Sequence, residues 1–301
     1  MGATATGKTE LAVQLVQELP CDIVSVDSVM VYQGMDIGSA KPDAEILAKA
    51  PHRLIDICDP GEVFSVSRFR ELALQEIADI HAQGRIPLLT GGTMLYFKAL
   101  EKGLAPLPPA DPALRQSLEA EARDRGWQAL HARLASVDPM AAERIHANDP
   151  QRIQRALEVY ELTGEPMSAW FEQEKAQPLP FQPVKLILEA PSREVLRERI
   201  AQRFDVMLQQ GLVAEIESLY RRGDLHAGLP AIRAVGYRQV WSYLEGVWGY
   251  ETMVERGIIA TRQFAKRQMT WLRGEDALRF DLMELDILKK VLKYLATNAI
   301  S

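Results

Sequence analysis

The sequence predicts an α/β protein in which a parallel sheet carries helices on both faces. Short apolar segments alternate with amphipathic helical segments up to residue 100, and the loops between them are short. A glycine-rich sequence of the kind that binds phosphate opens the chain. The 301 residues are 47% hydrophobic and 25% charged, with a net charge of -6. This composition excludes a disordered chain, a collagen-like repeat and a coiled coil.

The opening segment Gly2-Ala3-Thr4-Ala5-Thr6-Gly7-Lys8-Thr9 fits the P-loop pattern G-x-x-x-x-G-K-[ST], and Glu10–Leu19 follows as a helix. Backbone N–H groups of such a loop bind phosphate oxygens, Lys8 adds a positive charge, and the Thr9 hydroxyl can bind Mg2+. We therefore expect a P-loop NTPase-like sheet; the alternative is an ordinary glycine-rich turn. A buried strand normally precedes this loop, and only Met1 does so here, so we expect a truncated start and lower stability.

Three further strands are expected at 22–26, 54–57 and 87–90, with a helix over 67–83 before the last of them. The first ends at Asp27, and the last runs into Gly91-Gly92-Thr93. Ligands of open α/β sheets bind beyond the carboxyl ends of the strands, so both ends should lie near the P-loop. The alternatives stay open: Asp27 as a turn or cap residue, and 91–93 as an ordinary β–α turn.

Two proline-rich stretches, at 104–109 and 177–183, enclose a segment with only helical patterning. We expect an inserted helical subdomain over 107–182, and a catalytic core made of 1–106 and 183–301. Within the insertion, Asp149-Pro150 should begin a helix that Gly164 ends. The sheet should resume at 184–188. Helices should then follow at 192–210, 212–222 and about 252–272.

Basic residues gather in three places despite the negative total charge. No acidic residue occurs between Gly257 and Gly274, a stretch with four basic residues and Trp271, which suits a nucleic-acid phosphate backbone. Gln151, Arg152 and Arg155 share a helix, and Arg233–Arg238 is a glycine turn whose Tyr237 could stack on a base. The alternatives are solvated helix faces and a helix-capping turn.

Two cysteines, Cys21 and Cys58, are too few for a disulfide framework or an all-cysteine zinc site. No apolar stretch is long enough for a membrane span, and no signal peptide is evident at the start. The sequence therefore predicts a cytoplasmic protein that does not bind membranes.

Six of these segments, in this order, resemble the tRNA dimethylallyltransferase family, the bacterial tRNA isopentenyltransferases. They are Gly2–Thr9, Ser25–Pro42, Leu89–Tyr96, Asp149–Glu158, Ile232–Arg238 and Thr261–Arg273. The chain departs from the family pattern at Ala3, where proline is common, and at Met30, where many members have glutamine. It also lacks the opening strand and the zinc-finger tail of some eukaryotic relatives.

The resemblance implies an activity. A dimethylallyl group passes from dimethylallyl diphosphate to N6 of the adenosine 3′ of the tRNA anticodon, and diphosphate is released. It implies Mg2+ as the cofactor, with Thr9 as its protein ligand, and a P-loop that binds the leaving diphosphate. Asp27 is then the base, Thr93 lies near diphosphate and amine, and Lys8 neutralises charge. Arg199 and Arg203 are possible further diphosphate ligands, and we expect a monomer.

The resemblance also implies a set of residues that bind the anticodon stem-loop of tRNA, and it implies that the helical insertion binds this arm. The set is Asp27, Ser28, Val29, Met30, Thr93, Arg115, Gln151, Arg152, Ile153, Gln154, Arg155, Arg233, Ala234, Val235, Gly236, Tyr237, Arg238, Lys266, Arg267, Gln268, Met269, Thr270, Trp271, Leu272 and Arg273. The competing hypotheses are a P-loop kinase of a small metabolite, an adenylate isopentenyltransferase, and a nucleotide- or tRNA-binding module without activity.

Overall fold

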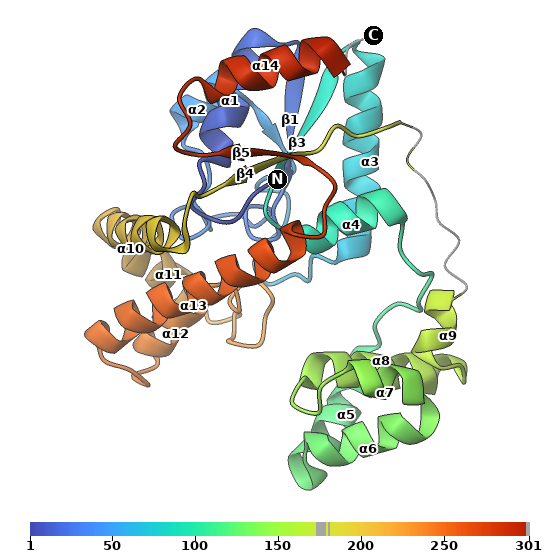
Figure 1. Cartoon of the computed structure of the whole chain (residues 1–301). Helices are drawn as coiled ribbons and strands as arrows, with labels where there is room; N and C mark the ends of the chain where they lie inside the picture. The colour runs from blue at the N-terminus through green and yellow to red at the C-terminus, as the bar shows by residue number, and fades with distance from the viewer. Residues whose placement is uncertain (173–178, 180, 299–301) are drawn as a thin grey trace. The chain divides into compact units, whose positions relative to one another are not determined.

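A computed structural model of the chain describes residues 1–172, 179 and 181–298. It divides into two compact units, one formed by Met1–Leu100 with Pro180–Ser301 and the other by Glu101–Leu179 (Figure 1). The expected insertion was 107–182, so the helical unit begins six residues earlier and ends three residues earlier. Part of the second proline-rich stretch, at 177, 178 and 180, lies outside the described residues.

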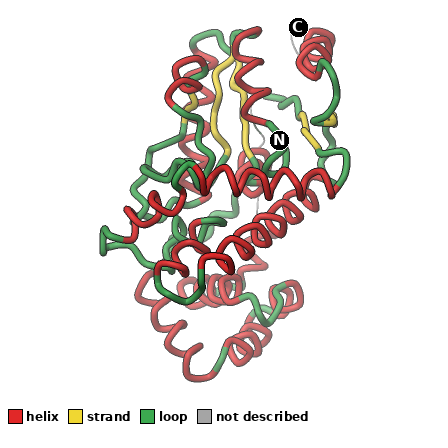
Figure 2. The backbone as a smooth tube through the Cα atoms, turned by 90° about the vertical axis from the view of Figure 1, so that its left-hand side faces the viewer, coloured by secondary structure: helices red, strands yellow, loops and turns green. Residues whose placement is uncertain are grey.

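The first unit is built on three parallel strands in the order β2-β1-β3, where β1 is Cys21–Val26, β2 His52–Arg53 and β3 Ile86–Gly91 (Figure 2). The β1–β3 register pairs Cys21 with Ile86 and Val26 with Gly91. The two strands therefore end side by side, and the residues that follow them leave the sheet at one edge. This confirms the α/β class and the parallel sheet.

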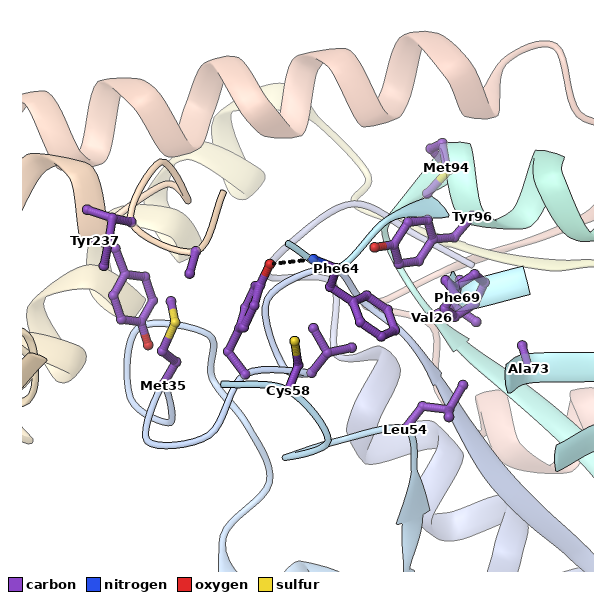
Figure 3. Packing of buried hydrophobic residues seen from close by; sticks show 14 of the residues in the cluster. Val26, Met35, Leu54, Cys58, Phe64, Phe69, Ala73, Met94, Tyr96 and Tyr237 are labelled. Carbon is purple, nitrogen blue, oxygen red and sulfur yellow. Dashed lines mark hydrogen bonds between the residues drawn. The ribbon is translucent and has the colours of Figure 1, made fainter. Parts of the chain in front are cut away.

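Helices cover both faces of this sheet, as the packing of the β1 side chains shows. Ile23 packs with α1 (Lys8–Glu18), and Val24 and Val26 pack with α3 (Val66–Ala82). On the α3 face, the Phe69 and Tyr96 rings stack with centroids 4.0 Å apart (Figure 3). Two shorter helices, α2 (Ala44–Lys49) and α4 (Met94–Lys102), follow β1 and β3.

Two strand predictions are wrong. The segment 54–57 is not a strand, because Leu54 and Asp56 adopt φ angles of 63° and 55°, which are incompatible with a β ladder, so pairing ends at Arg53. The segment 184–188 does not rejoin the three-stranded sheet. Instead β4 (Leu186–Glu189) pairs in parallel with β5 (Leu278–Asp281) in a two-stranded sheet.

The start of the chain runs alongside β4. The amino group of Met1 donates to the Leu186 carbonyl at 2.7 Å, the Leu188 N–H donates to the Met1 carbonyl at 2.9 Å, and Gly2 bridges Leu188 in parallel. Burial and the charge of Lys8 lower the pKa of the Met1 amino group from 8.0 to about 5. These contacts fix the place where the P-loop begins.

The rest of this unit is helical, with α10 (Arg193–Gln209), α11 (Leu212–Tyr220), α12 (Tyr237–Leu244), α13 (Tyr250–Leu272) and α14 (Ile287–Asn298). Ser192 caps α10 as expected, since its side chain accepts the Val195 N–H. Helix α14 packs beside α1, and α10–α13 lie together at a distance from it (Figure 1). In the described part of the chain, no helix combines the length and apolarity needed to cross a bilayer.

The second unit consists of helices α5 (Pro112–Arg125), α6 (Trp127–Val137), α7 (Pro139–Arg144), α8 (Pro150–Thr163) and α9 (Met167–Glu172). An aspartate followed by proline begins α5, α7 and α8, and the aspartate accepts a backbone N–H each time. Gly164 ends α8 in the left-handed conformation, as predicted. The core is formed by Leu118, Leu130, Leu134, Ile153 and Leu157.

Candidate functional site

Two adjoining cavities lie where β1 and β3 end. The larger has a volume of about 1110 Å³ and contains the P-loop, Asp27 and the end of β3 in its wall. The smaller, about 300 Å³, is lined by Ser28, Thr93, Arg233 and Arg267 among others. Both cavities share Thr4, Ala5, Asp27, Ser39, Arg203, Met207 and Phe264. Asp27 therefore lies at the boundary between a space beside the phosphate loop and a second, arginine-lined space.

The P-loop is a tight turn that leads directly into α1. Gly7 has φ 81° and Ala5 has φ 63°, both left-handed, and the Thr6 hydroxyl donates to the Ala3 carbonyl at 2.9 Å. At Gly2 a Cβ atom would lie 2.7 Å from the Leu188 carbonyl oxygen, so the close approach to β4 requires glycine. Glycine at the first and last loop positions is thus explained by the backbone path.

Two positive side chains face the larger cavity without a carboxylate partner. Lys8 Nζ donates to the Ala3 carbonyl at 2.6 Å, and among the described residues neither Lys8 nor Arg203 forms an ion pair. Burial and the neighbouring charge of Arg203 lower the pKa of Lys8 from 10.5 to about 8, while Asp27 opposes this. Burial also lowers the pKa of Arg203. Partly desolvated cations without partners beside a phosphate loop are suited to an anionic ligand.

Arg199 lies one helical turn before Arg203 on α10, as its spacing predicts. Its Nε donates to the Ala5 carbonyl at 2.9 Å, so Arg199 holds the backbone of the P-loop. It is not among the residues that line either cavity, whereas Arg203 lines both. In this structure the pair is therefore divided between holding the loop and facing the cavities.

Asp27 and Thr93 come together as their strand positions predict. Asp27 Oδ1 accepts the N–H groups of Val29 and Met30 at 2.8 and 3.2 Å, so it also forms the turn that its alternative role required. Thr93 Oγ1 accepts the Ser28 N–H at 3.1 Å, and the Thr93 N–H donates to the Val26 carbonyl at 3.2 Å. The two turns are thus joined: Asp27 lies at the shared boundary, and Thr93 lines the smaller cavity.

The residues around Thr9 fit a magnesium ion that also binds a diphosphate. Thr9 is the second residue of α1, lines the larger cavity, and makes no side-chain hydrogen bond to any described residue. Mg2+ keeps several waters and takes few protein ligands when phosphate oxygens complete its shell. No cluster of three or more His, Cys, Asp or Glu able to hold a metal occurs in the described residues, so an ion here would have few protein ligands, and the Thr9 hydroxyl is suited to be one of them.

The glycines at the end of β3 line the larger cavity beside the P-loop, as their strand position predicts. They make close contact with the protein itself: a Cβ on Gly91 would lie 2.0 Å from the Val26 carbonyl oxygen, and one on Gly92 would lie 2.4 Å from Gln268 Nε2. The close approach of β1 and α13 therefore requires glycine at this strand end.

Several residues of the predicted tRNA-binding set have buried side chains, which corrects their expected surface role. Tyr237 is 0% exposed and its hydroxyl donates to Glu215 Oε1 at 2.7 Å, so it cannot stack on a base. Ile153 and Leu272 are core residues. Gly236 and Gln268 are also buried, but Gly236 lines the smaller cavity, and Gln268 lines the larger one and bonds to the P-loop. The charge pattern predicts a surface role for each whole segment, so it does not distinguish these buried residues from their exposed neighbours.

Three arginines of the set form ion pairs in the helical unit. Arg152 pairs with Asp149, with Nε and Oδ2 3.4 Å apart. Arg115 and Arg155 both bind Glu158, whose side chain is 0% exposed, and Arg155 also donates to the Pro108 carbonyl. Gln154 Nε2 donates to the Arg115 carbonyl and to Glu119. The exposed members of the set are Gln151, Arg152, Arg233, Arg238, Lys266, Arg267, Thr270, Trp271 and Arg273. The half-buried members are Asp27, Ser28, Val29, Met30, Thr93, Arg115, Gln154, Arg155, Ala234, Val235 and Met269.

Comparison with known proteins agrees with this site. The sequence model of the IPP transferase family matches residues 30–275. The chain belongs to the IPP transferase family. The tRNA dimethylallyltransferase of Thioalkalivibrio sulfidiphilus is 62% identical over 284 residues, which covers 94% of this chain and 89% of that protein.

Two solved structures of the same kind are similar to this chain along almost its whole length. The tRNA isopentenylpyrophosphate transferase of Bacillus halodurans aligns with a TM-score of 0.71 and 39% identity, covering 98% of this chain and 93% of that one. A eukaryotic dimethylallyltransferase acting on tRNA aligns with a TM-score of 0.81 and 27% identity, covering 98% of this chain and 76% of that one. The resemblance drawn from six short segments is therefore confirmed.

Some site residues have roles that the sequence pattern does not assign to them individually. Ser39, Met207 and Phe264 line both cavities, and Glu215 holds the loop that contains Ser39. Glu215 accepts the N–H groups of Asp36, Ile37 and Gly38 at 2.9, 2.6 and 3.2 Å, as well as the Tyr237 hydroxyl. A single glutamate in an amphipathic helix resembles any surface residue, so only the three-dimensional arrangement identifies it.

Proposed function

We propose that this chain transfers a dimethylallyl group from dimethylallyl diphosphate to N6 of the adenosine 3′ of the tRNA anticodon and releases diphosphate. The proposal extends the activity of its tRNA dimethylallyltransferase relatives to this protein. The observation that carries it is the position of Asp27. Asp27 lies between a phosphate loop with unpaired cations and a second cavity lined by three arginines, where a donor and an acceptor could meet.

The first step concerns the leaving group. The allylic C–O bond breaks as negative charge builds on the diphosphate, and fixed positive charge in a partly desolvated site stabilises that charge. Lys8 and Arg203 supply it, and the backbone N–H groups of Gly7 and α1 add their dipoles. Mg2+, held by the Thr9 hydroxyl and the diphosphate, supplies further charge neutralisation when bound.

Asp27 then takes the proton from the attacking amine. An adenine amine is barely basic, since its lone pair is delocalised into the ring, and it becomes strongly acidic only as the new C–N bond forms. An ordinary carboxylate, with a pKa of about 4, is basic enough for a proton of that kind. Its Oδ1 atom is occupied by two backbone N–H groups, so Oδ2 is the oxygen assigned to this role. Thr93 lines the smaller cavity beside Ser28.

The acceptor is proposed to lie along the exposed basic residues. Within the first unit these are Arg233, Arg238 and the exposed side chains of α13, namely Lys266, Arg267 and Arg273. Trp271 is 42% exposed beside Lys98, and offers an aromatic face. A loop base can leave its stack at a cost of a few kcal/mol and enter the smaller cavity. We assign the helical unit, through Gln151 and Arg152, to the anticodon stem-loop, and expect a cytoplasmic monomer.

Nucleoside mass spectrometry tests this proposal. An unmodified tRNA transcript is incubated with the protein, Mg2+ and dimethylallyl diphosphate, with AMP present as a competing acceptor. The expected result is an isopentenyl mass gain on adenosine in tRNA alone. A gain on AMP would assign the reaction to a free nucleotide instead. Turnover of ATP with no prenyl transfer, in a parallel tube, would support a kinase and refute the proposal.

A further inference from the structure

Gln268 belongs to the basic helix but turns away from its exposed side. It follows Lys266 and Arg267 on α13, both exposed, and is itself only 5% exposed. Its Oε1 atom accepts the N–H of Thr4 at 2.9 Å, and its Nε2 atom donates to the carbonyl of Gly92 at 2.7 Å. One side-chain amide therefore connects α13 to the P-loop and to the turn that ends β3.

The chemistry of both partners fixes which atom of the amide faces which. A backbone N–H requires an acceptor and a carbonyl requires a donor, and among side chains of this size glutamine supplies both. Gly92 has no Cβ where one would lie 2.4 Å from Nε2 and 3.3 Å from the Gly2 carbonyl oxygen. The close approach of three segments at this point is therefore built into the backbone as well as into Gln268.

The connection continues to the reacting groups. Gly92 precedes Thr93, whose hydroxyl accepts the Ser28 N–H at 3.1 Å, and Ser28 follows Asp27. Toward the other side, Thr4 lines both cavities, in the loop that holds Lys8. The hydrogen-bonded path Thr4–Gln268–Gly92 thus joins the diphosphate side of the site to the side of the base. The bond to Gly92 is buried and the bond to Thr4 is partly buried, so loss of the side chain leaves polar backbone groups that water does not fully satisfy.

We propose that Gln268 is a positioning residue that couples tRNA binding on α13 to diphosphate binding in the P-loop. This inference rests on the proposed function. An acceptor that holds the exposed side chains of α13 fixes the helix, and the amide of Gln268 then fixes the P-loop and the Thr93 turn in the geometry that receives the diphosphate. By thermodynamic reciprocity, diphosphate must strengthen tRNA binding by the same factor.

The test measures tRNA affinity with and without saturating inorganic diphosphate and Mg2+, by fluorescence anisotropy of a labelled transcript. For the wild-type protein we expect diphosphate to tighten tRNA binding about fivefold or more. Gln268→Leu should reduce this factor to about one and weaken diphosphate binding about tenfold, since Thr4 N–H and Gly92 carbonyl lose their partner. The matched control is Gln209→Leu, at an exposed position of α10 that lines neither cavity, which should keep the wild-type factor.

Gln268→Glu separates positioning from packing. The carboxylate has the same shape and still accepts the Thr4 N–H, but it cannot donate to the Gly92 carbonyl. We expect the coupling to be lost here as well, and this variant carries the test if circular dichroism shows the leucine variant unfolded. Wild-type coupling in either folded variant would overturn the inference, as would a wild-type protein with no coupling. If the wild type transfers no prenyl group at all, the proposed function fails instead.

Discussion

The ammonium of Lys8 donates to the carbonyl of Ala3, 2.6 Å away in the same loop. The side chain therefore folds over its own P-loop, and a bound diphosphate must compete with a backbone carbonyl for it. The same residue sits next to Arg203, so two positive charges are held together without a carboxylate in ion-pair contact among the described residues. An anion between them would relieve that repulsion, which makes Lys8 the residue whose protonation reports on the site.

Diphosphate affinity should depend on pH through Lys8. Its pKa is lowered to about 8, so the free protein loses the ammonium above that pH and must take up a proton to bind the anion. Affinity for inorganic diphosphate should fall by up to about tenfold per pH unit above pH 8, measured by calorimetry with Mg2+. Lys8→Met removes the dependence and corrects for ionisation of the ligand. Parallel curves for both proteins would contradict the assignment.

Asp27→Asn should abolish transfer while the turn survives. The asparagine oxygen can still accept the N–H groups of Val29 and Met30, but the amide cannot take a proton. The single-turnover rate of prenyl transfer should fall by about 10²- to 10⁴-fold, with tRNA affinity within about threefold of wild type. Retention of the wild-type rate would show that Asp27 is a turn residue only.

Tyr237→Phe should act on stability, because the hydroxyl binds the partly buried carboxylate of Glu215. We expect a loss of about 1 kcal/mol in the free energy of unfolding, measured by thermal denaturation. Tyr220→Phe is the matched control, since Tyr220 is 38% exposed, and its change should stay within about 0.5 kcal/mol. If Tyr237→Phe left stability unchanged and weakened tRNA binding, the result would support base stacking by Tyr237 and contradict its structural role.

Glu158→Leu should destabilise the helical unit. Burial raises the pKa of this carboxylate, but Arg115, Arg155 and the Asp111 N–H outweigh burial, so the net shift is downward. Its contribution to stability is therefore present above the ordinary value of 4.5 and is lost as the pH falls below it. We expect a loss of about 3 kcal/mol, seen as faster hydrogen exchange in α5 and α8.

The exposed pair of Glu161 with Arg133 provides the control for that variant. Because the Glu161 side chain is 35% exposed, against 0% for Glu158, Glu161→Leu should cost less than about 1 kcal/mol. Equal hydrogen exchange in the two variants would mean that the Glu158 cluster adds no more than a surface ion pair.

The sequence was sufficient where a local rule decides the structure. The Asp-Pro starts of α8 and its Gly164 end, the Ser192 cap of α10, and the placement of Asp27 and Thr93 at strand ends all follow from short-range chemistry. The two wrong strand predictions have other causes, one a pairing partner far along the chain and the other two unusual backbone angles. No residue near 184–188 indicates that β4 pairs with a strand at 278–281. No residue near 54–57 indicates that two residues there adopt left-handed φ angles.

The side chains of the basic segments show the same limit. Their charge pattern predicts a surface, yet Gln268 and Tyr237 point inward because their partners, Thr4 with Gly92 and Glu215, come from distant elements. Arg199 and Arg203 lie four residues apart on α10 but have different neighbours, so only Arg203 faces the cavities. Burial and long-range hydrogen bonding therefore separate the residues that contact a ligand from those that hold them in place.

The central claim is that the P-loop of this chain holds the diphosphate of a prenyl donor. The stoichiometry of a single reaction tests it most directly, by quantifying inorganic diphosphate and prenylated adenosine in tRNA together. We predict equal amounts of the two, formed from dimethylallyl diphosphate without ATP and lost together in Asp27→Asn. Release of inorganic phosphate from ATP, with no prenylated adenosine, would contradict the claim.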